Sequence, residues 1–142
     1  MKKCNEVMTK YPVCCLPTDS VAKAADLMKK GNFGSIPVIE NEQTQNLVGI
    51  VTDRDLALTI VAEGRDAKST TVEAVMTRKV VSCFAEDDLQ KALDAMAKQQ
   101  LRRIPIVDHD HRIVGIITQA DVATRINQPE KTAQVVKEIS QN

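Results

Sequence analysis

Aromatic side chains and long apolar runs are scarce in this sequence. One tyrosine, two phenylalanines and no tryptophan occur among its 142 residues, so a base-stacking platform for single-stranded nucleic acid is not expected. No apolar stretch approaches the roughly 20 residues that cross a bilayer. No apolar segment follows the basic residues Lys2 and Lys3, as one would in a secretion signal. We therefore expect a cytoplasmic protein with an aliphatic core and no membrane partner.

An excess of charge of either sign is also absent. Lysine and arginine number 19, and aspartate and glutamate number 19, so the formal net charge is zero. A balanced chain lacks the basic surface that is typical of proteins binding nucleic acid. We expect no nucleic-acid partner, and the 43% of hydrophobic residues predict an ordinary globular domain.

The cysteines lack the spacing of a zinc site, because no C-x-x-C pair occurs. Adjacent residues of a strand point to opposite faces, so Cys14 and Cys15 cannot easily hold one metal ion together. We expect the thiols to be packing residues in a reducing compartment, and redox sensing is the alternative. The four cysteines are Cys4, Cys14, Cys15 and Cys83.

Enzyme signatures are missing as well. The sequence contains no G-x-S-x-G, no Walker P-loop and no H-E-x-x-H. His109 and His111 stand in a predicted hairpin loop, where we interpret them as exposed turn residues, with metal binding as the alternative. We expect no catalytic residue, no metal and no resident cofactor.

What the sequence does contain is an internal repeat. The spacing between matching residues is constant except at one loop, Asn41 to Asn46, which is longer than its counterpart, His109 to Arg112. Hairpin loops are where folds tolerate such insertions. The matching segments are Val-Met-Thr at 7–9 and 75–77, Ile-Pro-Val-Ile at 36–39 and Ile-Pro-Ile-Val at 104–107, and Val-Gly-Ile-Val-Thr at 48–52 and Val-Gly-Ile-Ile-Thr at 114–118.

Each repeat predicts the element order β-α-β-β-α. A short strand is expected around 13–15 and 80–82, then a helix, a hairpin of two apolar strands and a second helix. We place the N-cap of the first helix at Thr18 or Asp19, and at Asp87 in the second repeat. The apolar faces of the first helices are Val21, Ala24, Ala25 and Met28, and Leu89, Ala92, Leu93 and Met96. Those of the second helices are Leu56, Ile60 and Val61, and Val122, Ala123 and Ile126.

The repeats predict an α/β protein of two such motifs packed with pseudo-two-fold symmetry. We assign residues 1–64 to the first motif, 65–127 to the second and 128–142 to a helical tail. The tail has Val135, Val136 and Ile139 on one face, and it is expected to dock on its own domain or on a partner subunit. Because the first helices have more apolar surface than one small domain obviously needs, we expect a homodimer.

A seven-residue pattern, G-h-h-T-x-x-D, occurs in both repeats, at 49–55 and 115–121. A strand ending at a helix start offers backbone N–H groups to a phosphate. Thr52 and Thr118 can then bond phosphate, and Asp55 and Asp121 can accept bonds from the hydroxyls of a ribose. In the alternative interpretation, the threonines are N-caps and the aspartates are acids favoured in a first helical turn.

These motifs resemble the CBS domain, named after cystathionine β-synthase, and the pair resembles a Bateman module over about residues 5 to 127. The short stand-alone form resembles bacterial hypoxic-response-type proteins. The resemblance implies a regulatory sensor that binds an adenosine-containing nucleotide in clefts between the two motifs: AMP, ADP, ATP, an NAD-type dinucleotide or S-adenosylmethionine. It also implies that Asp55 and Asp121 hold ribose and that Thr52 and Thr118 hold phosphate. Residues around the first strand would frame the adenine, namely Val13, Cys14, Val80 and Val81.

The basic residues differ between the repeats. Arg102 and Arg103 precede the Ile-Pro pair of the second repeat, where the first repeat has Gly34 and Ser35. Some relatives have basic phosphate ligands at this place, so the two arginines resemble phosphate ligands, for which the planar guanidinium is suited. In the alternative interpretation they are solvated or paired with surface acids. A ligand-free interaction module and a thiol switch are the alternative functions, and an unidentified effector protein is a further expected partner.

Overall fold

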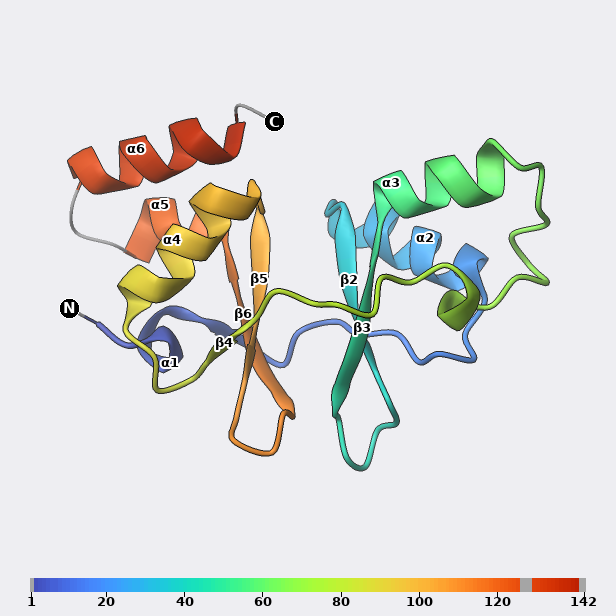
Figure 1. Ribbon diagram of the computed structural model, residues 1–142, viewed down its shortest axis with the longest axis horizontal. Coiled ribbons are helices and arrows are strands. Elements are labelled where there is room, and N and C mark those ends of the chain that lie inside the picture. The colour runs from blue at the N-terminus through green and yellow to red at the C-terminus, as the bar shows by residue number, and fades with distance from the viewer. Residues whose placement is uncertain (1, 126–128, 141–142) are drawn as a thin grey trace. The chain divides into compact units, whose positions relative to one another are not determined.

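The chain divides into two units that do not coincide with the sequence repeats. The computed structural model describes residues 2–125 and 129–140 (Figure 1). One unit, Val13–Val80, is unbroken in sequence, and we call it the continuous unit. The other joins Met1–Pro12 to Val81–Asn142, and we call it the composite unit. Ile126, predicted on a helix face, lies outside the described residues.

The continuous unit is built on a β-hairpin. Helix α2 (Val21–Gly31) leads into strands β2 (Ser35–Ile39) and β3 (Leu47–Thr52), which pair antiparallel. A parallel bridge joins Cys15 to Val38, and an antiparallel bridge joins Thr77 to Ile50. The predicted order of elements is confirmed, although the expected first strand is reduced to the bridge at Cys15.

The helix that follows β3 is irregular. It begins as α3 (Asp53–Leu56) and continues as a π-helix, η1 (Ala57–Val61). Ile60 is buried as predicted, but Val61 is 78% exposed, because the wider π turn moves the last residues off the α-helical period. A 3-10 turn, η2 (Val72–Ala74), follows later in this unit.

The composite unit contains a four-stranded sheet in the order β1-β6-β5-β4. Strand β1 pairs antiparallel with β6, β6 pairs antiparallel with β5, and β4 pairs parallel with β5. The first strand of the second repeat was predicted at 80–82, and this position is wrong, since the ladder bonds of β4 begin only at Cys83. The strands are β1 (Thr9–Lys10), β4 (Cys83–Phe84), β5 (Arg103–Val107) and β6 (Ile113–Thr118).

Three helices of this unit contact its sheet, and the predicted tail forms a fourth helix that packs on two of them. The composite unit contains α1 (Cys4–Val7), α4 (Leu89–Gln99), α5 (Gln119–Arg125) and α6 (Pro129–Ser140). Helix α6 packs against α4 and α5 of its own unit, so docking on the same chain is what the structure shows. Within the described ranges, no helix is long and apolar enough to cross a membrane.

Helix α2 begins one or two residues later than predicted, and α4 begins one residue later. Ser20 is the N-cap of α2 and accepts a bond from the Lys23 N–H, and Asp88 is the N-cap of α4. Asp19 and Asp87 do not cap these helices, because their carboxylates accept bonds from the preceding loops instead. Asp19 Oδ2 accepts from the Leu16 N–H at 2.8 Å, and Asp87 Oδ2 accepts from the Phe84 N–H at 2.8 Å.

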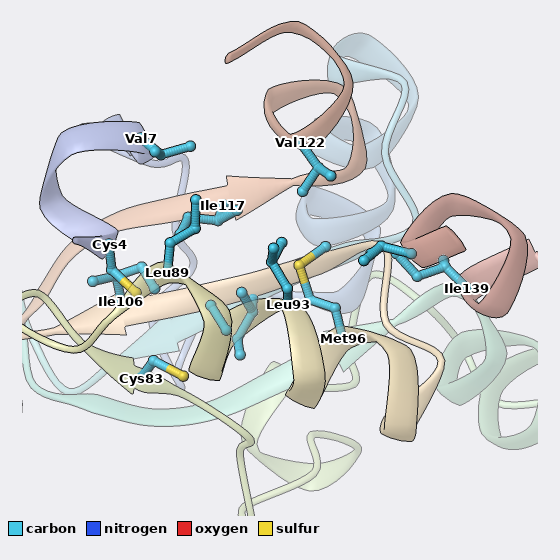
Figure 2. Packing of buried hydrophobic residues seen from close by; sticks show 13 residues of the cluster. Cys4, Val7, Cys83, Leu89, Leu93, Met96, Ile106, Ile117, Val122 and Ile139 are labelled. Atoms are coloured by element: carbon cyan, nitrogen blue, oxygen red, sulfur yellow. The ribbon is translucent and has the colours of Figure 1, made fainter. Parts of the chain in front are cut away.

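Each unit has its own aliphatic core. In the composite unit, Leu93 and Met96 of α4 lie near Ile139 of α6 (Figure 2), and all three are at most 1% exposed. Among the described residues, the predicted helix faces are confirmed except at Ala25, Val61 and Ala123, which are exposed. The residues that were expected to leave apolar surface for a homodimer are buried within their own units, so that argument for a dimer is wrong: Val21, Ala24, Met28, Leu89, Ala92 and Met96.

The two Val-Met-Thr segments pack on the sheet of the opposite repeat. Thr9 lies opposite Ile116 of the second repeat, and Thr77 lies opposite Ile50 of the first repeat. The methionine before each threonine lies over the motif glycine: a Cβ at Gly115 would collide with Met8, and a Cβ at Gly49 would meet Met76 Sδ. The compact units therefore exchange these segments relative to the sequence repeats.

Candidate functional site

Each G-h-h-T-x-x-D motif forms a reciprocal cap where a strand ends and a helix begins. In the continuous unit, the Asp55 N–H donates to Thr52 Oγ1 at 3.0 Å, and the Thr52 N–H donates to Asp55 Oδ2 at 3.0 Å. These two bonds form a capping box that fixes both side chains at the start of α3. The capping alternative is thus correct as a description of geometry, and it leaves the hydroxyl proton of Thr52 available for another acceptor.

The composite unit has the same cap and one bond more. The Asp121 N–H donates to Thr118 Oγ1 at 3.1 Å, and the Thr118 N–H donates to Asp121 Oδ2 at 3.0 Å. In addition, Thr9 Oγ1 lies 3.2 Å from Asp121 Oδ1 and 3.3 Å from Oδ2. Asp121 is only 7% exposed, whereas Asp55 is half-buried.

The first-turn N–H groups of α3 are already bonded, contrary to the expectation that they would be open to phosphate. The Asp53 N–H donates to the Gly34 carbonyl at 2.8 Å, and the Arg54 N–H donates to Asp53 Oδ1 at 2.8 Å. The next N–H, of Asp55, is bonded to Thr52. An anion at this motif would therefore depend on side chains.

Strand pairing brings the unequal residues of the two repeats beside the motif threonines. Ser35 is the register partner of Thr52, and Arg103 is the register partner of Thr118. Arg102 is exposed, and its carbonyl accepts a bond from the Gln119 N–H at 2.8 Å. Arg103 thus lies on the strand paired with the one that ends in the second motif. Its role as a phosphate ligand stays a prediction.

The residues expected to frame adenine lie where the chain passes from one unit to the other, at Pro12–Val13 and at Val80–Val81. Val13 is 45% exposed and Val81 is 37% exposed, while Cys14 and Val80 are half-buried. Exposed valines are available to a flat apolar ligand. No contact in the described residues tests that role, which stays a prediction.

Three of the four cysteines lie in environments that disfavour the thiolate. All four are free thiols. Burial raises the pKa of Cys4 to about 12 and that of Cys15 to about 11, from 9.0, and it also raises the pKa of Cys83. Because the thiolate is the reactive form, these three thiols are poor candidates for a redox switch.

The histidines lie in the β5–β6 turn, as predicted. His109 Nε2 is 3.1 Å from Glu86 Oε2, and its ring stacks on Phe84 with centroids 5.7 Å apart. His111 has a positive φ of 64°. Among residues 2–125 and 129–140, no group of three or more His, Cys, Asp or Glu side chains could hold a metal ion.

Residue-by-residue reasoning missed Thr9 and Thr77. The Val-Met-Thr segments served only as markers of the repeat, although their recurrence was the available signal. Thr9 contacts Asp121, 112 positions later in the sequence, and a contact over that distance has no local pattern.

These features define a class: paired β-α-β-β-α motifs in which a threonine and an aspartate cap the last helix of each. A family model for the CBS domain matches residues 4–62 and 72–128. The chain belongs to the CBS domain family.

Three similar proteins illustrate the match. The CBS domain-containing protein YhcV of Bacillus subtilis is 37% identical over 140 residues, covering 99% of this chain and 96% of YhcV. The crystal structure of Hypoxic Response Protein I with two coordinated zinc ions aligns with a TM-score of 0.77 and 27% identity, over 88% of this chain and 99% of that one. The CBS domain pair of protein MJ0100, in complex with 5′-methylthioadenosine and S-adenosyl-L-methionine, aligns with a TM-score of 0.73 and 27% identity, over 87% and 94%.

Proposed function

We propose that this chain is a regulatory module that binds an adenosine-containing ligand at its T-x-x-D motifs and does not catalyse a reaction. Thr52 and Asp55 are the residues that bind the ligand in the continuous unit, and Thr118 and Asp121 are the equivalent residues in the composite unit. The related CBS pair of MJ0100, crystallised with two adenosyl compounds, supports the ligand class. The ligand binds one conformation of the module more tightly than another and so shifts their populations. An effector protein then detects this shift.

The observation that carries this proposal is the carboxylate of Asp55. Its Oδ2 is fixed by the cap at 3.0 Å from the Thr52 N–H. No donor to Oδ1 is found within residues 2–125 and 129–140, and the side chain is half-buried. A positioned carboxylate with one oxygen open suits the hydroxyls of a ribose, which are neutral donors to a charged acceptor.

Thermal unfolding with a ligand panel tests the proposal. We expect at least one of AMP, ADP, ATP, NADH and S-adenosylmethionine to raise the midpoint in a concentration-dependent way, because a ligand that binds the folded state stabilises it. Asp55→Asn keeps an oxygen for the capping bond and loses the charge, so it should weaken binding about tenfold to a hundredfold with little change in the unliganded midpoint.

A matched control is available two residues earlier. Asp53 is an exposed carboxylate of the same short helix, and Asp53→Asn should leave ligand affinity unchanged. If no member of the panel moves the midpoint, the ligand-free interaction module replaces this proposal. If Asp55→Asn lowers the unliganded midpoint and leaves affinity unchanged, Asp55 is a cap only.

We further propose that the module is a homodimer located in the cytoplasm. The exposed Leu58 and Val61 of the continuous unit are apolar residues still available to a partner. Sedimentation velocity at micromolar concentration tests this directly, since a single species with the mass of one chain would contradict it.

A further inference from the structure

The two motif aspartates differ in what already occupies them. Thr9 Oγ1 lies 3.2 Å and 3.3 Å from the two carboxylate oxygens of Asp121, and the Thr118 N–H also donates a hydrogen bond to Oδ2. Asp55 is held by the Thr52 N–H on Oδ2 alone, as far as the described part of the chain shows. A hydroxyl on a carboxylate is the same bond that a ribose would make there.

The two motifs differ in the bond of one threonine, although the two threonines hold equivalent positions. Thr77 is the counterpart of Thr9: each follows a methionine that covers a motif glycine, and each lies opposite an isoleucine of the neighbouring strand. In the residues that the structure describes, no bond joins the Thr77 hydroxyl to Asp55. The threonine therefore closes one motif and leaves its counterpart open.

The helix after the open motif also departs from regular geometry. The segment Ala57–Val61 is a π-helix, whereas α5 continues from Asp121 as a regular α-helix to Arg125. Single π turns are rare and concentrate at functional sites. This second difference points to the same motif.

We infer that Thr9 is a specificity-determining residue that occupies Asp121 in place of a ribose hydroxyl, so that an adenosine-containing ligand binds the Asp55 motif first. This inference rests on the proposed function and assigns an order to its two sites. A ligand at Asp121 must break the Thr9 bond before its ribose can reach the carboxylate, whereas a ligand at Asp55 meets an open oxygen. The Thr9 residue itself is exposed, so its hydroxyl can turn away and the second site fills at higher concentration.

Amide NMR during titration with adenosine resolves the two motifs. In the wild type, we expect the amides of Thr52 and Asp55 to shift at a concentration about tenfold lower than those of Thr118 and Asp121. Thr9→Val removes the hydroxyl at constant shape and should bring the two midpoints together. Thr9→Ser retains the hydroxyl and should keep the wild-type order, and Thr77→Val is the matched control that should change nothing at Asp121.

The titration outcomes test the role of Thr9 separately from the proposed function. Equal titration midpoints for the two motifs in the wild type, or filling of the Asp121 motif first, overturn the role of Thr9 whatever the variants do. An unchanged order in both Thr9→Val and Thr9→Ala also overturns it. Titrations in which neither adenosine nor any of AMP, ADP, ATP, NADH and S-adenosylmethionine shifts either motif overturn the proposed function and this inference with it.

Discussion

The two units share one pattern and use it differently. Leu93 in α4 is 1% exposed and packs in the core that α6 completes, whereas its repeat counterpart in α2, Ala25, is exposed. Asp121 of the composite unit is buried and accepts a bond from Thr9, whereas Asp55 of the continuous unit is half-buried and has an open carboxylate oxygen. One copy of a repeat can thus gain packing while the other keeps an accessible motif.

The largest effect is expected from the helix that α6 covers. Leu93→Ala should lower the free energy of unfolding by about 2–5 kcal/mol, because it leaves a cavity that the neighbouring α-helices fill only in part. Chemical denaturation measures this loss. Lys29→Ala is the control in the continuous unit, where the side chain is exposed on α2, and its effect should be close to zero. Equal losses would show that the two helical layers are packed alike.

The motif glycines should give the next largest effect. An added Cβ at Gly115 would lie 3.0 Å from the Thr9 carbonyl oxygen and would collide with Met8, and one at Gly49 would lie 3.1 Å from the Thr77 carbonyl oxygen. Gly115→Ala and Gly49→Ala should each destabilise by about 1–3 kcal/mol through overpacking. Adding Met8→Ala to Gly115→Ala should recover part of the loss, measured by the same denaturation. No recovery would mean that the backbone contact alone limits this position.

Alkaline pH should destabilise both units through their buried thiols. An unfolded thiol ionises near pH 9, and burial raises the pKa of Cys4 to about 12 and that of Cys15 to about 11. The folded state therefore binds more protons above pH 9, so its stability is complete below that pH and is lost as the pH rises toward 11 and 12. Each thiol should lower the free energy of unfolding by about 1.4 kcal/mol between pH 8 and pH 10.

Alanine variants assign this loss to its unit. Cys4→Ala should remove part of the loss in the composite unit and leave the contribution of Cys83, and Cys15→Ala should remove the loss of the continuous unit. A pH dependence unchanged in both variants would show that other groups cause it.

The smallest effect concerns the caps. Thr118→Ala and Thr52→Ala each remove a cap acceptor and should cost about 0.5–2 kcal/mol. We expect the higher end at Thr118, since its partner Asp121 is buried and water cannot replace the lost bond there. Melting temperatures of both variants beside Thr118→Ser and Thr52→Ser give the comparison. A larger loss at Thr52 would reverse our ranking of the two motifs.

Local patterns in the sequence predict most of the fold. The spacing of Val21, Ala24 and Met28 predicts a helix face because each turn repeats the same contact, and the hairpins follow from two apolar runs with a polar loop between them. The family resemblance rests on the same repeated segments.

What the sequence could not predict is which of two similar sheets a segment joins. Val-Met-Thr at 7–9 fits the hairpin of either repeat by its own pattern, and only the complete structure places Thr9 on Ile116 and beside Asp121. The same holds for the open oxygen of Asp55, since only the structure shows that Thr9 bonds Asp121 and that, among the described residues, no bond joins Thr77 to Asp55. Roles that depend on long-range contacts therefore stayed beyond local reasoning.

The exchange of segments between repeats also sets an order on synthesis. The continuous unit has all its residues within Val13–Val80, so it is complete soon after that stretch leaves the ribosome. The segment Cys4–Lys10 leaves the ribosome before the continuous unit, yet its partner strand β6 ends at Thr118, so it stays unpaired until β6 has been made. This segment is thus made before the continuous unit and pairs only after that unit is complete.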